Sequence, residues 1–263
     1  MNPIVVVGMG ELGSVFARGF LKLGHPVVPV TRGGRFADAL EHAPSPELVL
    51  VTVGEDDLAP VLAELPVPWR DRVALVQNEL LPEQWLAHGV VDPTVAIVWF
   101  EKKAGREATE VRPTLVTGPH EALLLRALGA LHISAKRLAP EELSHELVVK
   151  NLYILTLNLA GLHTRGKAGE LLTQHRPLFD RLVPELIRLE RGLLGAAGAE
   201  QDEARLTQDL EASILADPEH ASAGRSAPRR LERTLAHAHR LGLTLPTLEH
   251  LAARAATSSP HGN

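Results

Sequence analysis

The sequence predicts an α/β protein, with a mostly parallel sheet in residues 1–140 and an all-helical region in residues 141–263. Three observations lead to this prediction. Short apolar runs alternate with helical patterns in the first part, a glycine-rich motif follows the first run, and strand-like segments cease near Pro140. Strands that alternate with helices in this way form βαβ units, whose crossovers are right-handed.

Composition limits the class of protein. The chain has 263 residues, of which 45% are hydrophobic, so two modest domains with buried cores can form. The absence of cysteine excludes disulfides, zinc–thiolate sites and cysteine nucleophiles. The net charge is −5 with both signs interspersed, which indicates no nucleic-acid partner. With no signal-peptide pattern and no apolar run of about 18 residues, we expect no membrane contact and a cytoplasmic location.

Each element is predicted from its periodicity. Continuous β-branched runs are typical of buried parallel strands, and apolar residues at helical spacing are typical of amphipathic helices. The predicted strands are Pro3–Val7, Val27–Val30, Leu48–Val53, Val73–Val76, Val95–Trp99 and Thr114–Val116. The predicted helices are Glu11–Leu23, closed by Gly24, and Leu58–Leu65, Glu141–Leu162, Leu178–Leu194 and Arg229–Leu241. We expect a loop at Asp217–Pro228 and a frayed tail at Thr257–Asn263.

The glycine-rich motif is Gly8-Met9-Gly10-Glu11-Leu12-Gly13, which has the pattern G-x-G-x-x-G. Its place between a strand and a helix is the context of a dinucleotide-binding loop, and it predicts a Rossmann-type domain. The first glycine permits the tight turn, the second lets pyrophosphate approach the backbone, and the third lets helix and strand pack closely. The alternative is a purely structural strand–helix turn.

The residues after the second strand favour NADP over NAD. That strand ends at Val30 and is followed by Thr31, Arg32 and later Arg35, with no acid before Asp38. NAD-binding proteins place an acid there for the ribose 2′-hydroxyl, whereas an arginine pairs with a 2′-phosphate. The alternative is that both arginines merely face solvent.

These motifs resemble the ketopantoate reductase family, NADP-dependent enzymes with a Rossmann domain and a helical domain like that of 6-phosphogluconate dehydrogenase. The resemblance places Arg32 at the 2′-phosphate and Asn78, in Val76-Gln77-Asn78, between nicotinamide and substrate. It also makes Lys150 the catalytic lysine and Asn158 a helical asparagine of the site. The turn Gly242-Leu243-Thr244-Leu245-Pro246 is similar to the closing turn of the family.

Several substrate-site positions depart from the family pattern. Ile154 replaces an asparagine, Gly54 replaces a lysine, and Glu79 replaces a glycine. The family's substrate-binding glutamate corresponds to Ser226, and a serine of the site corresponds to Ser213. The cofactor half of the predicted site therefore matches better than the substrate half.

The residue spacing on the helix that carries Lys150 supports a catalytic role for this lysine, independently of the family resemblance. Lys150, Ile154 and Asn158 are spaced i, i+4 and i+8 and share one side of a helix that is apolar nearly all round. A lysine beside a buried interface needs a partner or a cleft, and desolvation lowers its pKa toward that of a useful general acid. The alternatives are a surface ion pair between Glu146 and Lys150, and Asn151 and Asn158 as interface polar groups with local partners.

The sequence therefore predicts an NADP-dependent oxidoreductase that transfers hydride between NADPH and a small 2-oxo acid or related carbonyl. Lys150, Asn78 and Asn158 would be the catalytic residues, and the substrate would lie between the domains. The alternatives are a non-catalytic NADP-binding sensor and an oxidoreductase acting on an imine or amino-acid conjugate.

The remaining polar residues indicate no other site. The 13 histidines show no metal-binding spacing, and we expect the arginines at 181, 188, 191 and 229–233 to lie on solvated helix faces. The helix from Glu141 is apolar round most of its surface, so we expect part of it to pack on a partner subunit or on the Rossmann domain, and a homodimer is the commonest symmetric arrangement.

Overall fold

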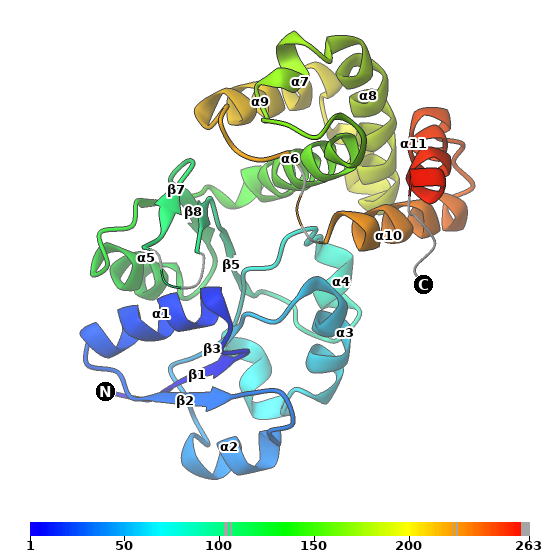
Figure 1. The fold of residues 1–263 in the computed structure, drawn as a ribbon. Helices are drawn as coiled ribbons and strands as arrows, with labels where there is room; N and C mark the ends of the chain where they lie inside the picture. Colours follow the sequence, from blue (N-terminus) through cyan, green and yellow to red (C-terminus); the bar gives the residue numbers. More distant parts are fainter. Residues whose placement is uncertain (103–104, 106, 223, 225, 259–263) are drawn as a thin grey trace, which may run out of the picture. The chain divides into compact units, whose positions relative to one another are not determined.

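The computed structural model describes residues 1–102, 105, 107–222, 224 and 226–258. The chain divides into two compact units, the first covering Met1–Ser144 and the second beginning at His145. Figure 1 shows a sheet flanked by helices in the first unit and only helices with their connections around α6–α11.

The first unit is built on a seven-stranded sheet with the order β2-β1-β3-β4-β5-β8-β9. Neighbouring strands run parallel except β5 and β8, which are antiparallel. The strands are β1 (Ile4–Val7), β2 (Val27–Val30), β3 (Leu48–Val51), β4 (Val73–Leu75), β5 (Thr94–Ile97), β8 (Thr114–Thr117) and β9 (Ala135–Arg137). The predicted α/β class and Rossmann-type sheet are therefore confirmed.

Strands β1, β3, β4, β5 and β8 are fully buried along their length, as expected for strands covered on both faces. The helices of this unit are α1 (Glu11–Lys22), α2 (Phe36–His42), α3 (Glu55–Glu64), α4 (Pro82–Leu86) and α5 (Glu121–Gly129). Phe16 and Phe20 of α1 pack with Leu124 and Leu128 of α5 and with Ile4 of β1 in one hydrophobic core. That core fixes α1 against the sheet and so holds the start of α1 beside the end of β1.

The sequence prediction was wrong or incomplete at several elements of the first unit. Helix α3 starts at Glu55, one turn before the predicted start, because three acidic residues in its first turn suit a helix N-terminus. Helices α2, α4 and α5 and strand β9 were not predicted, and neither were the short strands β6 (Phe100–Glu101) and β7 (Thr109–Glu110). The sixth strand runs antiparallel because a small sheet of β6 and β7, instead of a helix, connects β5 to β8.

The second unit contains α6 (Leu143–Thr164), which starts two residues before the unit boundary, α7 (Glu170–Thr173), α8 (Arg176–Leu193), α9 (Glu203–Ala216), α10 (Ala227–Arg240) and α11 (Pro246–Ser258). Helices α7, α9 and α11 were not predicted. The predicted loop at Asp217–Pro228 ends earlier, since α10 begins at Ala227, and Lys167 forms an isolated bridge with Ala221. Of the predicted tail, Thr257 and Ser258 belong to α11, and residues 259–263 lie outside the described residues.

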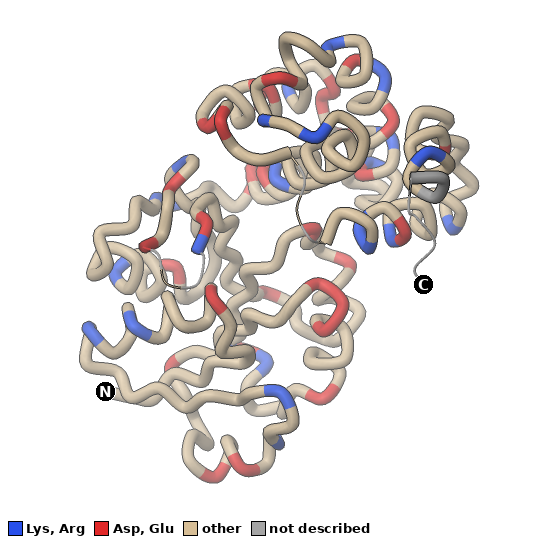
Figure 2. Tube along the Cα trace, in the orientation of Figure 1, with Lys and Arg blue, Asp and Glu red and all other residues tan. Residues whose placement is uncertain are grey.

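Three further observations concern partners. Lysines, arginines and acids are interspersed along both units (Figure 2). In the described part of the chain, no helix is both long enough and apolar enough to cross a membrane. Helix α6 is buried on most of its length within the single chain, so its apolar character does not by itself require a partner subunit, and the homodimer stays a prediction.

Candidate functional site

The glycine motif lies at the carboxyl edge of the sheet, where the strand order reverses between β1 and β3. The register pairs Val7 with Val30 on one side and with Val51 on the other, so the segments after β1, β2 and β3 begin at the same edge. In open α/β sheets this switch point is where ligands bind.

The loop itself has the conformation that its glycines were expected to permit. Gly8 has φ +92°, a backbone conformation that other residues rarely adopt, and its N–H donates to the carbonyl of Val30 at 2.9 Å. A Cβ on Gly13 would overlap the carbonyl oxygen of Gly8 and lie 2.7 Å from Thr52 Oγ1. Gly13 therefore allows α1 to start directly against the loop.

Gly10 differs from Gly13 because its surroundings are open. A Cβ on Gly10 would meet no heavy atom within 4 Å, and Met9, Gly10 and Glu11 are exposed while Leu12 is half-buried. Gly10 is the N-cap of α1, and no side chain caps the helix there. The first-turn N–H groups and the positive end of the helix dipole thus face open space, which is the geometry that binds a phosphate.

Thr52 is a structural part of this site that the sequence reading missed. Its hydroxyl lies within hydrogen-bonding distance of the carbonyl oxygens of Val7, at 3.1 Å, and Gly8. The hydroxyl therefore ties the residue after β3 to the turn after β1. The signal in the sequence was a polar residue directly after the apolar strand Leu48–Val51, at the same edge as the glycine motif.

Arg32 follows β2 at this edge and is held by one ion pair. Its Nη2 lies 3.5 Å from Asp57 Oδ2 in the first turn of α3, and the Arg32 side chain is 95% exposed. An exposed pair of this kind contributes little free energy, so the guanidinium can exchange Asp57 for another anion at small cost. Arg35 is likewise exposed, as the N-cap of α2.

The segment after β4 places Asn78 at the same edge. The Gln77 amide donates to the carbonyl oxygens of Val51 at 2.8 Å and Val53 at 3.3 Å, which fastens this segment to the end of β3. Glu79 has φ 55°, a left-handed conformation that favours glycine, at the position where the resemblance has a glycine. Asn78, between them, is half-buried. The position thus has a backbone conformation that suits glycine, although it carries glutamate.

In the second unit, α6 carries Lys150 and Asn158 on one side, two turns apart. Lys150 is half-buried, and its Nζ lies 5.6 Å from the centroid of the buried Tyr153 ring. This is a cation–π contact, which stabilises a lysine near apolar surface. Asn151, which follows Lys150, is almost fully buried and donates to Glu190 Oε2 at 3.0 Å.

Asn158 is engaged within the unit. Its Nδ2 donates to the carbonyl of Ile154 at 2.7 Å, and its Oδ1 accepts from Arg230 Nη1 at 3.5 Å. The same Arg230 nitrogen donates to the hydroxyl of Ser226, the N-cap of α10. The structure thus connects Asn158 and Ser226, two of the predicted substrate residues, through a guanidinium.

The prediction that residues 229–233 form a solvated face was wrong for Arg230, which is only 7% exposed. A run of charged residues does not reveal which of its side chains turns inward, and at the N-terminal end of α10 the Arg230 side chain packs toward α6.

Ser213 has a different place from the one predicted for a ligand-binding serine. It is fully buried on α9, and its hydroxyl donates to the carbonyl of Asp209 at 2.7 Å.

Comparison with solved structures covers nearly the whole chain. A PanE/ApbA family ketopantoate reductase from Ralstonia eutropha JMP134 has a TM-score of 0.67 at 15% identity, with 97% of each chain covered. The chain has the fold of the ketopantoate reductases. A probable 2-dehydropantoate 2-reductase from Bacillus subtilis has a TM-score of 0.66 at 18% identity, with 97% of this chain and 99% of that chain covered.

The same fold also serves a different enzyme. The structure of D-mandelate dehydrogenase with NADH and anilino(oxo)acetate has a TM-score of 0.63 at 13% identity, with 97% of each chain covered. No protein-family model matches the sequence, and no curated protein matches it at the sequence level. The resemblance stated from the motifs is therefore confirmed at the level of the fold.

Proposed function

We propose that this protein is an NADP-dependent oxidoreductase that transfers hydride between NADPH and a small 2-oxo acid or a related carbonyl compound. The observation that carries the proposal is the open backbone at Gly10, held between a tight turn at Gly8 and a tightly packed Gly13 at the switch point of the sheet. This loop fits the pyrophosphate of a dinucleotide. The shared fold with ketopantoate reductases and D-mandelate dehydrogenase supports the reaction class.

The choice of NADP rests on Arg32. No acid follows β2 to accept a hydrogen bond from a ribose 2′-hydroxyl, and the exposed guanidinium is available to a 2′-phosphate. Asp57 competes for that guanidinium, so NADPH must displace an existing ion pair. The cofactor would be held by the loop from Gly8 to Gly13, by Arg32 and by Asn78.

When bound, the cofactor supplies the hydride; the chain supplies binding, orientation and a proton. The Lys150 ammonium group would donate a proton to the carbonyl oxygen as it gains negative charge, and the remaining positive field would stabilise that oxygen. Asn78 would orient the reacting groups from the first unit. Asn158 would position Arg230, because both of its amide atoms already bind within the helical unit.

The substrate should differ from ketopantoate. Ile154, Gly54 and Ser226 replace polar groups that the family uses for its substrate, and Ser213 is buried away from solvent. A hydroxylated ligand would leave polar groups unmatched in such a site, which is costly. We propose a less hydroxylated or more apolar 2-oxo acid, and we expect weak or absent turnover of ketopantoate.

The test combines cofactor binding with turnover. NADPH fluorescence on titration measures binding, and NADPH oxidation is followed with a panel of 2-oxo acids that includes ketopantoate. The Lys150→Ala variant should bind NADPH within about threefold of the parent and lose about 10²–10⁴ in turnover, the usual contribution of a positioned general acid. The Lys136→Ala variant, which changes an exposed lysine of β9, is the matched control.

Three results would contradict the proposal. Efficient turnover of ketopantoate would refute the substrate assignment, and a fully active Lys150→Ala variant would move the proton donor elsewhere. Tight NADPH binding with no turnover on any 2-oxo acid, imine or amino-acid conjugate would favour an NADP-binding sensor. The engagement of both Asn158 amide atoms within the helical unit is the observation that favours this second candidate.

A further inference from the structure

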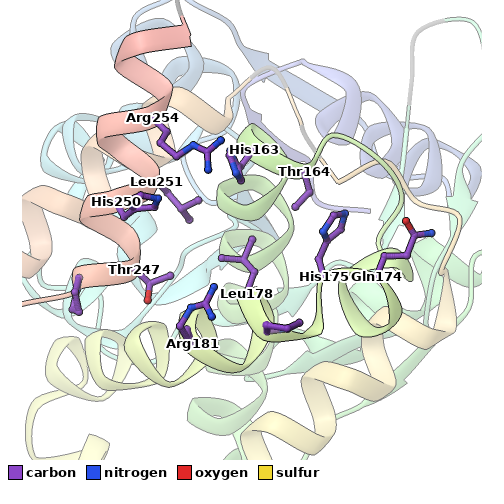
Figure 3. Close-up of a pocket in the computed structure, with 12 residues that line it drawn as sticks. His163, Thr164, Gln174, His175, Leu178, Arg181, Thr247, His250, Leu251 and Arg254 are labelled. Carbon is purple, nitrogen blue, oxygen red and sulfur yellow. The ribbon is translucent and has the colours of Figure 1, made fainter.

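A second concave site lies within the helical unit and has no part in the function proposed above. It has a volume of about 690 Å³ and is lined by the end of α6, the segment from Gln174 into α8, and α11 (Figure 3). His163 comes 13 residues after Lys150 on α6, which corresponds to about 20 Å along a helix axis. The concavity is therefore separate from the Lys150 region.

Basic and titratable side chains dominate the polar part of the lining. His163 comes from α6, His175 and Arg181 from the α8 side, and His250 and Arg254 from α11. None of the 12 lining residues is Asp or Glu. Figure 3 shows His163 and Arg254 close to each other at one end of the concavity, with His175 further along the same wall.

These groups act on one another electrostatically. The pKa of His163 is lowered, first by burial and then by the positive charges of Arg254, His250 and His175. The cluster thus gathers groups that repel one another when charged, without an acid in the lining to compensate. A bound anion would remove this repulsion and favour the charged imidazoles.

The acids of the helices that form the walls are committed to other partners. Glu185 of α8 accepts hydrogen bonds from the N–H groups of Thr247, at 2.9 Å, and Leu248, at 3.1 Å, and so caps α11. The remaining acids of α8 and α11 bind elsewhere, as follows: Asp180 to Arg176, Glu190 to Asn151 and Glu249 to the N–H of Leu245. These carboxylates keep their charge, but none of them is among the residues that line the concavity.

The rest of the lining is apolar and defines the shape of the ligand. Leu178 and Leu251 line the concavity from α8 and α11 (Figure 3), and Pro177 and Pro246 are also among its lining residues. We propose that this concavity binds a small organic anion with an apolar body, the anionic group lying among His163, Arg181, His250 and Arg254 and the apolar body against Leu178 and Leu251. Small-molecule sites commonly combine an apolar wall with a few convergent polar groups.

The experiment uses the full chain and 1,5-naphthalenedisulfonate, an apolar ring with two anionic groups whose charge is constant near neutral pH. Isothermal titration should give a dissociation constant on the order of 0.1 mM, as expected for a ligand of this size in an open site. Methanedisulfonate, which carries the same two anionic groups without the apolar rings, should bind at least about tenfold more weakly. Equal affinity for the two probes would refute the role of the apolar wall.

Charge reversals test the placement of the anion. Arg181→Glu and Arg254→Glu should each weaken binding of the naphthalene probe by at least about tenfold, since an attraction becomes a repulsion. Lys136→Glu makes the same change in net charge on β9 of the first unit, outside the lining, and should leave the affinity within about twofold. Binding that is unchanged in both lining variants, or weaker than about 10 mM in the parent, would overturn the proposal.

The pH dependence tests the imidazoles. The charged and titratable groups that act on His163 are His175 from the α8 side and His250 and Arg254 of α11, while Arg181 of α8 lines the same concavity. Because the anion favours protonated histidines, the affinity for the probe should rise at least about threefold between about pH 8 and about pH 6. His163→Ala should reduce this rise while retaining the circular dichroism of the parent. An affinity that does not change with pH would overturn the imidazole contribution.

Discussion

Replacing either of two glycines of the same loop by alanine should impair the protein, but one substitution should lower its stability and the other should weaken cofactor binding. In Gly13→Ala, the added methyl group would overlap the carbonyl oxygen of Gly8 and lie 2.7 Å from Thr52 Oγ1. Neither neighbour can turn away, because one is backbone and the other is held by the carbonyl oxygens of Val7 and Gly8. Helix α1 or the turn must then shift, and overpacking of this kind costs about 1–3 kcal/mol of unfolding free energy.

Gly10→Ala is the matched variant with the same chemical change. The added methyl group would meet no protein atom within 4 Å, and the Gly10 φ of −75° suits alanine. The unfolding free energy should therefore change by less than about 1 kcal/mol. The methyl group would, however, occupy the space in which pyrophosphate approaches the backbone, so NADPH affinity should fall by at least about tenfold.

Urea unfolding followed by circular dichroism measures the stability of both variants, and NADPH fluorescence measures their affinity. The expected pattern is a Gly13→Ala protein with a lower urea midpoint and a Gly10→Ala protein with a normal midpoint but weak cofactor binding. A Gly10→Ala protein that binds NADPH as tightly as the parent would refute the placement of the pyrophosphate. A Gly13→Ala protein with unchanged stability would refute the packing argument.

Three further predictions follow from single contacts. Arg32→Ala should weaken NADPH binding by about 1–2.5 kcal/mol, because a hydrogen bond to a charged group contributes about 1.5–3 kcal/mol and the lost ion pair with Asp57 offsets part of that contribution. The affinity for NADH should stay nearly constant, and equal losses for the two cofactors would refute a 2′-phosphate contact. Glu185→Ala should cost about 1–3 kcal/mol of unfolding free energy because the N–H groups of Thr247 and Leu248 lose their acceptor, and an unchanged urea midpoint would show that water replaces the carboxylate. Light scattering at micromolar concentration should give the mass of a dimer, and a monomer mass of 28.4 kDa would count against the homodimer.

Local sequence determined the cofactor half of the candidate site. The run Ile4–Val7, the glycine motif and helix α1 are contiguous, so strand, turn and helix could be predicted from residues that are neighbours in the chain. The same is true of the place of Arg32 directly after β2. The pairing register that brings Thr52 to Gly8 was not accessible, since it joins residues 44 positions apart.

The short elements escaped prediction for a related reason. Strand β9 is only three residues long and contains the charged residues Lys136 and Arg137, so it lacks the apolar run of a buried strand. It exists because β8 offers it a parallel hydrogen-bonding edge. The antiparallel direction of β8 likewise follows from the β6–β7 connection and not from its own residues.

The sequence by itself determined the α/β class, the glycine loop and the placement of Lys150 and Asn158 on one side of a helix, because these depend on spacing along the chain. Tertiary structure alone decided that Arg230 turns inward to Asn158, and that histidines and arginines from α6, α8 and α11 surround one concavity. A helical pattern states which residues share a face, but burial and electrostatic field depend on what packs against that face. That information resides in contacts between segments far apart in the chain.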